Sequence, residues 1–423
     1  MIRGPMRLRL ATEWNDFLSP YLQSRLWLRG MDPYSSENFL KFWPGDKPPF
    51  NFIIKNAAEG SLVSKRGVPS PYPPTAFVVL APLALASWKT AQFLWITLSL
   101  AAIGFIIWSL VEIAGASWRD RRSWLFAAFT LALAPFHTGL ATGNPVVLVI
   151  ALCSASIWAE RKSRIFLCAT LLALAICLKP QIGMCFLLFF IVQQCWNVAV
   201  IAGSISLVLS SLAVVRLAVT GAPWFSSYLQ TTRQIFQSGA INDFTPLNPV
   251  WFHMLNLQVV LYPLLGGIRL ANFVAVLFGA ALGGLWLWKH VKSGPHEACL
   301  LSLSALLVIS LMPVYHRTYD AALVVFPLAW LMLDQQGPKR FARPGLALIA
   351  IFLSPGGVFV HQLAMRAHLP AEVLNSVSWR VFVVSHQTWA LFFLAVFLLR
   401  SMFRASLRET QLEETAPELV LQS

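Results

Sequence analysis

Residues 91–115 read AQFLWITLSLAAIGFIIWSLVEIAG and contain a single charged side chain, Glu112, near the end of the stretch. A run of about 20 apolar residues is long enough to cross a bilayer as an α-helix. Comparable apolar segments follow at 124–136, 145–159, 165–178, 182–196, 198–219, 268–288, 298–314, 321–334, 344–360 and 389–403. The sequence therefore predicts an all-α polytopic membrane protein with about eleven spans.

The composition of the whole chain indicates the same class. Of the 423 residues 57% are hydrophobic and 12% are charged, and the mean hydropathy is +0.64, whereas soluble domains carry about a quarter charged residues. The net charge of +14 comes from short basic runs between apolar segments, which is typical of cytoplasmic loops and gives no reason to expect nucleic acid as a partner. The six cysteines form no CxxC pair, so we interpret them as small buried hydrophobes.

The basic runs predict how the chain is oriented. Under the eleven-span count they all fall on one side, which the positive-inside rule makes cytoplasmic; these runs are 119–122, 161–164, 289–292, 339–343 and 400–408. The other side carries residues 1–73, 137–144, 179–181, 220–256, 315–320 and 361–388. We expect a multi-pass protein of the cytoplasmic (inner) membrane, surrounded by its lipids, whose functional face is extracytoplasmic.

Three regions follow from this division. Residues 1–90 are predicted to form an extracytoplasmic loop domain with interfacial helices and, at 75–86, a re-entrant segment too short to span. Residues 91–403 form the transmembrane bundle, and the acidic residues 404–423 form a disordered cytoplasmic tail.

Five short motifs occur in order along the predicted outer face: Asn15-Asp16-Phe17 with Gly30-Met31-Asp32-Pro33-Tyr34, Tyr72-Pro73-Pro74 with Ala81-Pro82-Leu83, Thr142-Gly143-Asn144-Pro145, Leu178-Lys179-Pro180-Gln181, and Pro313 with Tyr319-Asp320. Together they resemble glycosyltransferase family 87, a family of the GT-C superfamily. The resemblance implies a GT-C-type multi-helix bundle that moves a sugar, mannose first of all, from a polyprenyl-phosphate donor to an extracytoplasmic glycan or glycolipid. It also implies a transmembrane helix ahead of the Asp16 motif, which we expect to lie upstream of Met1.

Asp16 matches the catalytic aspartate of the family. The resemblance implies a β-linked donor and an α-linked product, hence inversion in one step with one carboxylate as base, unlike the two carboxylates of glycosidases. The residue type alone leaves another reading open, because Asp is a common N-cap at the start of a helix. Asp32 stands in a Gly-Met-Asp-Pro turn and is expected to shape the loop that positions Asp16.

Three basic or imidazole side chains are candidates for binding the donor phosphate. Lys179 lies between two very apolar segments on the side where few cations are expected, although it could also extend to the membrane interface without a further role. Arg317 suits a phosphate because guanidinium binds it in a bidentate way, and His316 could donate a hydrogen bond. Alternatively, Arg317 pairs with Asp320 three residues later.

The remaining candidate residues belong to the same motifs. Their matches in the family imply a substrate-positioning role for Asp32, Tyr34, Asn144, Gln181, Tyr319 and Asp320. The polar stretch 220–256 is rich in aromatic and amide side chains, which suit sugars and an interfacial aromatic belt equally well.

Several other classes find no support in the sequence. It has no phosphate-binding loop for ATP, no metal-ligand spacing and no DxD pair for a nucleotide sugar, so neither a metal site nor a cofactor is predicted. A transporter or flippase of lipid-linked intermediates remains the alternative, but it would be expected to show internal repeats and mid-membrane charges. An inactive scaffold also remains open.

Overall fold

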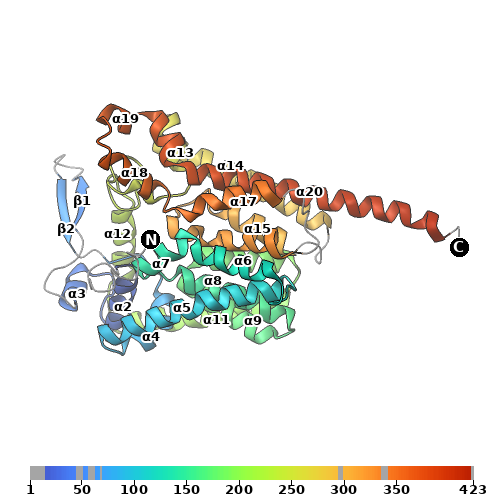
Figure 1. Ribbon diagram of the computed structural model, residues 1–423. Coiled ribbons are helices and arrows are strands. Elements are labelled where there is room, and N and C mark those ends of the chain that lie inside the picture. The colour runs from blue at the N-terminus through green and yellow to red at the C-terminus, as the bar shows by residue number, and fades with distance from the viewer. Residues whose placement is uncertain are drawn as a thin grey trace.

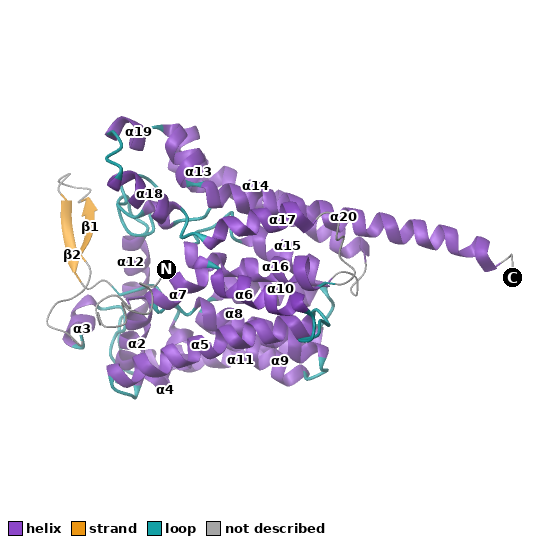
Figure 2. Cartoon of the chain, in the orientation of Figure 1, coloured by secondary structure: helices purple, strands orange, loops and turns teal. Residues whose placement is uncertain are grey.

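The computed structural model describes residues 15–43, 51–55, 62–66, 69–293, 299–334 and 342–420, and its elements are almost all helices (Figures 1 and 2). Four of the described helices are long and apolar enough to cross a membrane, as judged by length and composition. They are α5 (Trp88–Ile113), α11 (Trp196–Val219), α14 (Ile268–Ser293) and α20 (His386–Val420). The prediction of an all-α polytopic membrane protein is confirmed.

Two bent helix pairs raise the number of candidate spans to six if each pair counts as one. The first joins α6 (Arg121–Ala132) to α7 (Ala134–Thr142) with a bend of 47°. The second joins α17 (Ala342–Ala350) and the 3-10 turn η4 (Ile351–Leu353) to α18 (Gly357–Arg366) with a bend of 55°.

Shorter helices fill the space between the long ones. They are α4 (Pro74–Ala84), α8 (Val146–Arg161), α9 (Ile165–Leu178), α10 (Pro180–Val192), α15 (Cys299–Ser310), and the 3-10 helix η3 (Thr318–Val324) continued by α16 (Val325–Leu333). Their apolar side chains belong to one large core, in which α8 packs between α5 and α9. Each of the eleven predicted segments coincides with a helix or a bent pair, but eleven crossings stay a prediction.

The remaining elements gather at one end of the bundle, opposite the C-terminal end of α20 (Figure 1). They include α2 (Asn15–Leu28), α3 (Ser36–Lys41), α12 (Trp224–Ile235), η2 (Trp251–His253), α13 (Gln258–Leu265), α19 (Ala371–Asn375) and the π-helical turn η5 (Trp379–Val384). One antiparallel hairpin, β1 (Asn51–Lys55) and β2 (Leu62–Arg66), pairs Asn51 with Arg66.

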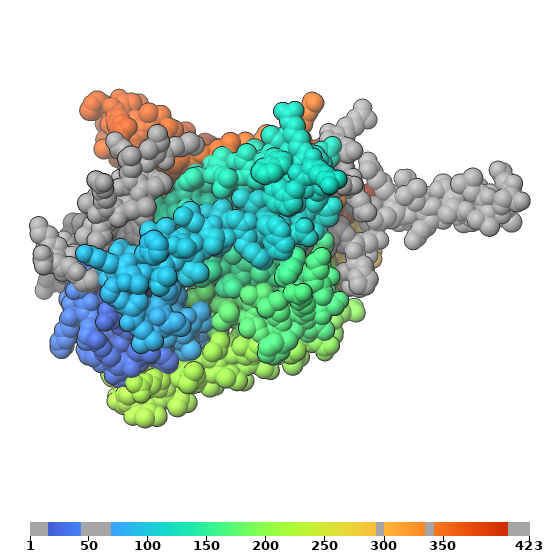
Figure 3. All heavy atoms as spheres, turned by 60° about the horizontal axis from the view of Figure 1, so that its bottom comes forward, coloured from blue at the N-terminus to red at the C-terminus, as the bar shows by residue number. Residues whose placement is uncertain are grey.

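The N-terminal part of the described chain differs from the loop domain that we expected. Helix α2 is buried in the main core, where the Phe17 ring stacks on Trp95 with 4.3 Å between centroids. It also contacts α11, since Trp27 Nε1 donates to the Ala213 carbonyl at 3.0 Å. In Figure 3 the blue N-terminal residues accordingly lie against the yellow-green ones. Aromatic burial explains why α2 is not a surface helix.

Two further expectations concern the ends of the predicted regions. The apolar stretch at 75–86 forms the 11-residue helix α4, which packs against α2 and α11; its re-entrant character stays a prediction. At the C-terminus, α20 runs on as a helix to Val420, where we expected a disordered tail. The Glu, Leu, Arg and Ala residues of this segment favour a helix.

Candidate active site

The break between α9 and α10 places Lys179 inside the bundle. Pro180 lacks a backbone N–H and takes the first position of α10, so α9 ends at Leu178. Lys179 is extended between the two helices, with φ −147° and ψ 82°, and is only 6% exposed. The helix break thus directs a lysine toward the interior.

Asn144 lies in the turn between α7 and α8. Gly143 closes α7 in the left-handed conformation with φ 68°, which glycine adopts at little cost. The Asn144 N–H donates to the Gly139 carbonyl at 2.9 Å, and the side-chain Oδ1 accepts from the Val146 N–H at 3.0 Å. These bonds to both helices fix the position of the amide.

The segment that leads into η3 holds His316 and Asp320 together. Asp320 Oδ2 accepts from the Arg317 N–H at 3.2 Å and lies 3.1 Å from His316 Nδ1. The Leu255 N–H donates to the His316 carbonyl at 3.1 Å. Both side chains are buried, and His316 Nε2 has no hydrogen-bond partner among the described residues.

Polar contacts connect these three places to Asp16. Asp16 Oδ2 accepts from Asn144 Nδ2 at 3.0 Å, and Lys179 Nζ donates to Asn144 Oδ1 at 3.3 Å. Lys179 Nζ also forms an ion pair with Asp320 Oδ1, and the other oxygen of Asp320 faces His316. A buried pair of this kind holds its geometry, because a displaced partner would leave an uncompensated charge. We call these five residues the polar chain.

Asp16 itself is the second residue of α2 and is partly exposed, in contrast to the rest of the polar chain. Tyr72 lies beside it and donates its hydroxyl to the Asp16 carbonyl at 3.5 Å. Burial raises the pKa of Tyr72 well above its ordinary value, and the negative charge of Asp16 raises it further. Tyr72 therefore stays protonated at neutral pH.

Tyr34 and Asp32 support Tyr72 through a series of hydrogen bonds. Tyr34 is buried and donates its hydroxyl to the Tyr72 carbonyl at 2.5 Å, while Asp32 Oδ1 accepts from the Tyr34 N–H at 2.9 Å. Asp32 thus accepts a local backbone hydrogen bond of the kind that its turn motif predicts, and its role in positioning substrate stays a prediction. Hydrogen bonds thus connect Asp32 and Tyr34 to Asp16 through Tyr72.

Arg317 is a cation within electrostatic range of Asp16. Its Nε donates to the Tyr315 hydroxyl, and its Nη2 donates to the Ile241 carbonyl at 3.0 Å and to Asn242 Oδ1 at 3.4 Å. Burial works to lower the pKa of Arg317, but the neighbouring Tyr315 and Tyr319 and the charge of Asp16 outweigh it and raise the pKa above its ordinary value. Arg317 Nη1 has no hydrogen-bond partner among the described residues.

Two alternative interpretations from the sequence are wrong in this structure. Asp16 does not serve as an N-cap, because it lies within α2 and its carboxylate bonds to Asn144 instead. Arg317 does not form an ion pair with the Asp320 side chain, which binds Lys179; only the Arg317 backbone N–H reaches Asp320. In both cases a partner distant in sequence replaces a local one.

The other predicted site residues divide into two groups. The Tyr319 ring lies 4.8 Å from Lys179 Nζ and so belongs with the polar chain. The Gln181 side chain is exposed in the first turn of α10, whereas Lys179 precedes that helix and is buried. A role of Gln181 in the site stays a prediction.

Sequence reasoning missed three residues around Asp16 and Arg317: Tyr72, Tyr315 and Asn242. Tyr72 opens the Tyr-Pro-Pro motif and Tyr315 precedes His316, but neither phenol had been given a role. Burial raises the pKa of Tyr315 to about 12, against the opposing effect of Arg317. Asn242 could not have been singled out, because nothing in the 220–256 stretch indicates which amide reaches Arg317.

Within the residues that the structure describes, no group of three or more His, Cys, Asp or Glu side chains is arranged to hold a metal ion. The acidic and basic groups of the site instead compensate one another, with Lys179 beside Asp320 and Arg317 near Asp16.

A comparison with protein families matches residues 71–313 to a model described as glycosyltransferase family 87. This range is more than half of the chain and contains Tyr72, Asn144, Lys179 and Gln181. Asp16 and the segment 315–320 lie outside it. No curated protein and no solved structure matches the chain.

Proposed function

Since the chain belongs to glycosyltransferase family 87, we propose that this multi-pass membrane glycosyltransferase uses a polyprenyl-phosphate sugar as its donor. The sugar is mannose, the acceptor is an extracytoplasmic glycan or glycolipid, and the bundle is of the GT-C type. The site faces the extracytoplasmic side of the cytoplasmic membrane. The observation that carries the proposal is the polar chain, which connects the partly exposed Asp16 to buried residues of three other segments.

Asp16 is the general base of the proposed reaction. The acceptor hydroxyl oxygen attacks the anomeric carbon, the bond from that carbon to the phosphate oxygen breaks, and the hydroxyl proton passes to Asp16. The phosphate leaves with the bonding electron pair on the face opposite the attack, so the anomeric configuration inverts. Asn144 holds Oδ2 of Asp16 and orients the carboxylate, while the partial exposure of Asp16 leaves room for the acceptor.

Arg317 is the better candidate for contact with the donor phosphate. The Lys179 ammonium already faces Asp320, Asn144 and the Tyr319 ring, so its charge is largely compensated. Arg317 is partly exposed, lies within electrostatic range of Asp16 and has an unused N–H group for a departing phosphate. His316 Nε2 is a second candidate for contact with the phosphate, and it donates only when both ring nitrogens carry a proton, because Nδ1 already faces Asp320. We therefore assign Lys179 a positioning role.

The experiment that tests this function is the substitution Asp16→Asn in the full-length protein in detergent or nanodiscs. Asn is isosteric and can still accept from Asn144, but it cannot take a proton. Transfer from a polyprenyl-phosphate mannose should fall by about 10²- to 10⁴-fold, the usual contribution of a general base. Donor binding, measured separately, should stay unchanged.

Asp120→Asn is the matched control, because Asp120 is also a helix-start aspartate and caps α6 through the Arg122 N–H at 2.9 Å. Asn caps as well as Asp, so this variant should transfer normally. If Asp16→Asn transferred sugar as fast as Asp120→Asn, Asp16 would not be the base.

A further inference from the structure

Helix α12 carries a polar face that the proposed reaction does not yet use. Ser226, Gln230 and Gln234 recur every four residues and so lie along one side of the helix, and Gln237 continues the row. From Ser226 to Gln234 the row extends roughly 12 Å at 1.5 Å per residue. This length suits an extended ligand better than a single small group.

The opposite face of α12 is tied to the site. The Tyr228 ring packs edge-on against Tyr34 with 5.1 Å between centroids, and Thr231 Oγ1 donates to the Tyr34 carbonyl at 3.5 Å. Tyr34 in turn bonds to Tyr72 beside Asp16. The contacts of Tyr228 and Thr231 with Tyr34 therefore hold the helix in place, and they leave its polar face open.

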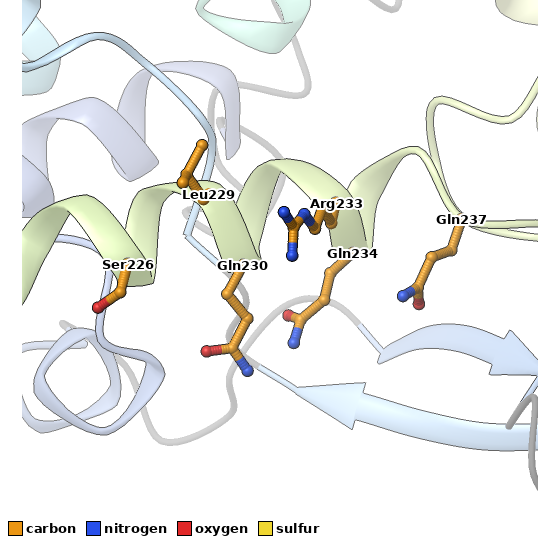
Figure 4. A pocket seen from close by; sticks show the side chains of 6 residues that line it. All are labelled: Ser226, Leu229, Gln230, Arg233, Gln234 and Gln237. Carbon is orange, nitrogen blue, oxygen red and sulfur yellow. The ribbon is translucent and has the colours of Figure 1, made fainter.

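An open groove of about 350 Å³ runs along this face. It is lined by Ser226, Leu229, Gln230, Arg233, Gln234 and Gln237, and Figure 4 shows the three glutamine side chains pointing to the same side of the helix. Among these six lining residues, Arg233 is the only charged one, and none carries a carboxylate. Amides both donate and accept hydrogen bonds, as neutral hydroxyl-rich ligands require.

The segment that follows α12 reaches Arg317. Directly after α12, the Asn242 N–H donates to the Ile235 carbonyl at 3.0 Å, so the chain folds back on the end of the helix. Asp243 stiffens this turn by accepting from the Gly239 N–H at 2.7 Å and from the Thr245 N–H at 2.9 Å. Ile241 and Asn242 then contact Arg317, so the segment after α12 connects the helix that carries the groove to the proposed donor-phosphate contact.

We propose that the groove along α12 binds the acceptor as a neutral, extended sugar chain. The amide row would hold successive hydroxyl groups and direct the end of the chain toward Asp16. This inference rests on the proposed glycosyl transfer, because it names the acceptor class for that reaction. A strongly anionic chain is not expected, since one arginine cannot neutralise repeated charges.

The test compares two variants. The first combines Gln230→Ala and Gln234→Ala in one protein. The second, the control, is Thr232→Ala, a change on α12 outside the groove. Alanine preserves the helix, so circular dichroism should be the same for both. Purified full-length protein is titrated with short neutral oligosaccharides of mannose, glucose and galactose, and with uronic-acid oligosaccharides. The double variant should bind its best neutral ligand about tenfold more weakly, because two hydrogen bonds to the ligand are lost.

The kinetic readout separates the acceptor site from the chemistry. In the double variant, KM for the acceptor should rise while kcat and KM for the donor stay near those of Thr232→Ala. Equal binding by both variants, no neutral ligand for the wild type, or a preference for the uronic-acid chains would each overturn the proposal. Asp16→Asn should lose transfer but keep oligosaccharide binding; if it keeps transfer, the proposed base is wrong, while the binding result still decides on the groove.

Discussion

At the scale of single residues, Lys179 shows how burial changes the meaning of a charge. A lysine on the outer face of an apolar bundle predicts an anion nearby, and the anion that the structure supplies is Asp320. Lys179 is only 6% exposed, so water cannot readily compensate the charge if Asp320 is removed. Lys179 also donates to Asn144, and Asn144 donates to the Asp16 carboxylate. The position of Lys179 therefore influences the position of Asp16.

The first prediction concerns this ion pair. Removing one partner of a buried pair leaves the other charge uncompensated, which costs about 3 to 5 kcal/mol. Lys179→Met and Asp320→Leu should therefore each lower the stability of the detergent-solubilised protein by that order. The double variant should lose less stability than the two single variants lose together, because neither charge is then left without its partner. Chemical unfolding of all four proteins measures this coupling, and additive losses would show that the pair contributes none.

At the scale of elements, the α9–α10 hairpin decides where Lys179 is held. The two helices approach closely at Gly183, where a Cβ atom would stand 2.6 Å from the Ile176 nitrogen and 2.7 Å from its Cα. These are backbone atoms of α9, which cannot rotate away. A glycine that the sequence leaves unremarkable thus sets the distance between the helices on either side of Pro180.

We therefore predict that Gly183→Ala forces α10 away from α9. Overpacking of this kind costs about 1 to 3 kcal/mol, and it should also reduce transfer by displacing Lys179 from Asn144. Gly104→Ala is the matched control, because α5 leaves open space around that glycine; it should be neutral or slightly stabilising. Melting temperature and transfer rate are measured together, and equal behaviour of the two variants would argue against the close approach.

At the scale of the whole molecule, several basic side chains lie at the ends of long helices. Arg161, at the end of α8, donates to the Ile113 carbonyl at the end of α5, and Lys292 and Trp288 lie in the last turns of α14, where Trp288 packs against Phe403 of α20. Arg161 and Lys292 thus lie at helix ends, where their charges need not enter lipid. The groove along α12 belongs to the opposite end (Figure 1).

This arrangement predicts the orientation in the membrane. In a background with the six native cysteines replaced by alanine, Gln237→Cys should react with an impermeant maleimide in sealed right-side-out vesicles. Lys162→Cys, in the basic turn after α8, should react only after permeabilisation. Both native side chains are exposed, so accessibility to solvent does not differ between them. The reverse labelling pattern would place the proposed site in the cytoplasm.

The sequence by itself determined the class of this protein. Long apolar segments can satisfy their backbone groups in lipid only as helices, so the helical bundle and most helix positions were predictable. The Asp32 turn followed from local preferences of the same kind. Short motifs also indicated Asp16, Asn144, Lys179 and Asp320 as candidates, since polar residues in an apolar chain stand out.

Only the tertiary structure decided which of these candidates meet. The Asp16–Asn144 and Lys179–Asp320 contacts join residues 128 and 141 positions apart, and helical periodicity carries no information about such pairs. Local rules suggested an N-cap for Asp16 and an Asp320 partner for Arg317, and both were replaced by distant contacts. The burial of α2 has the same cause, because aromatic packing between segments outweighs the local polarity that had indicated a loop.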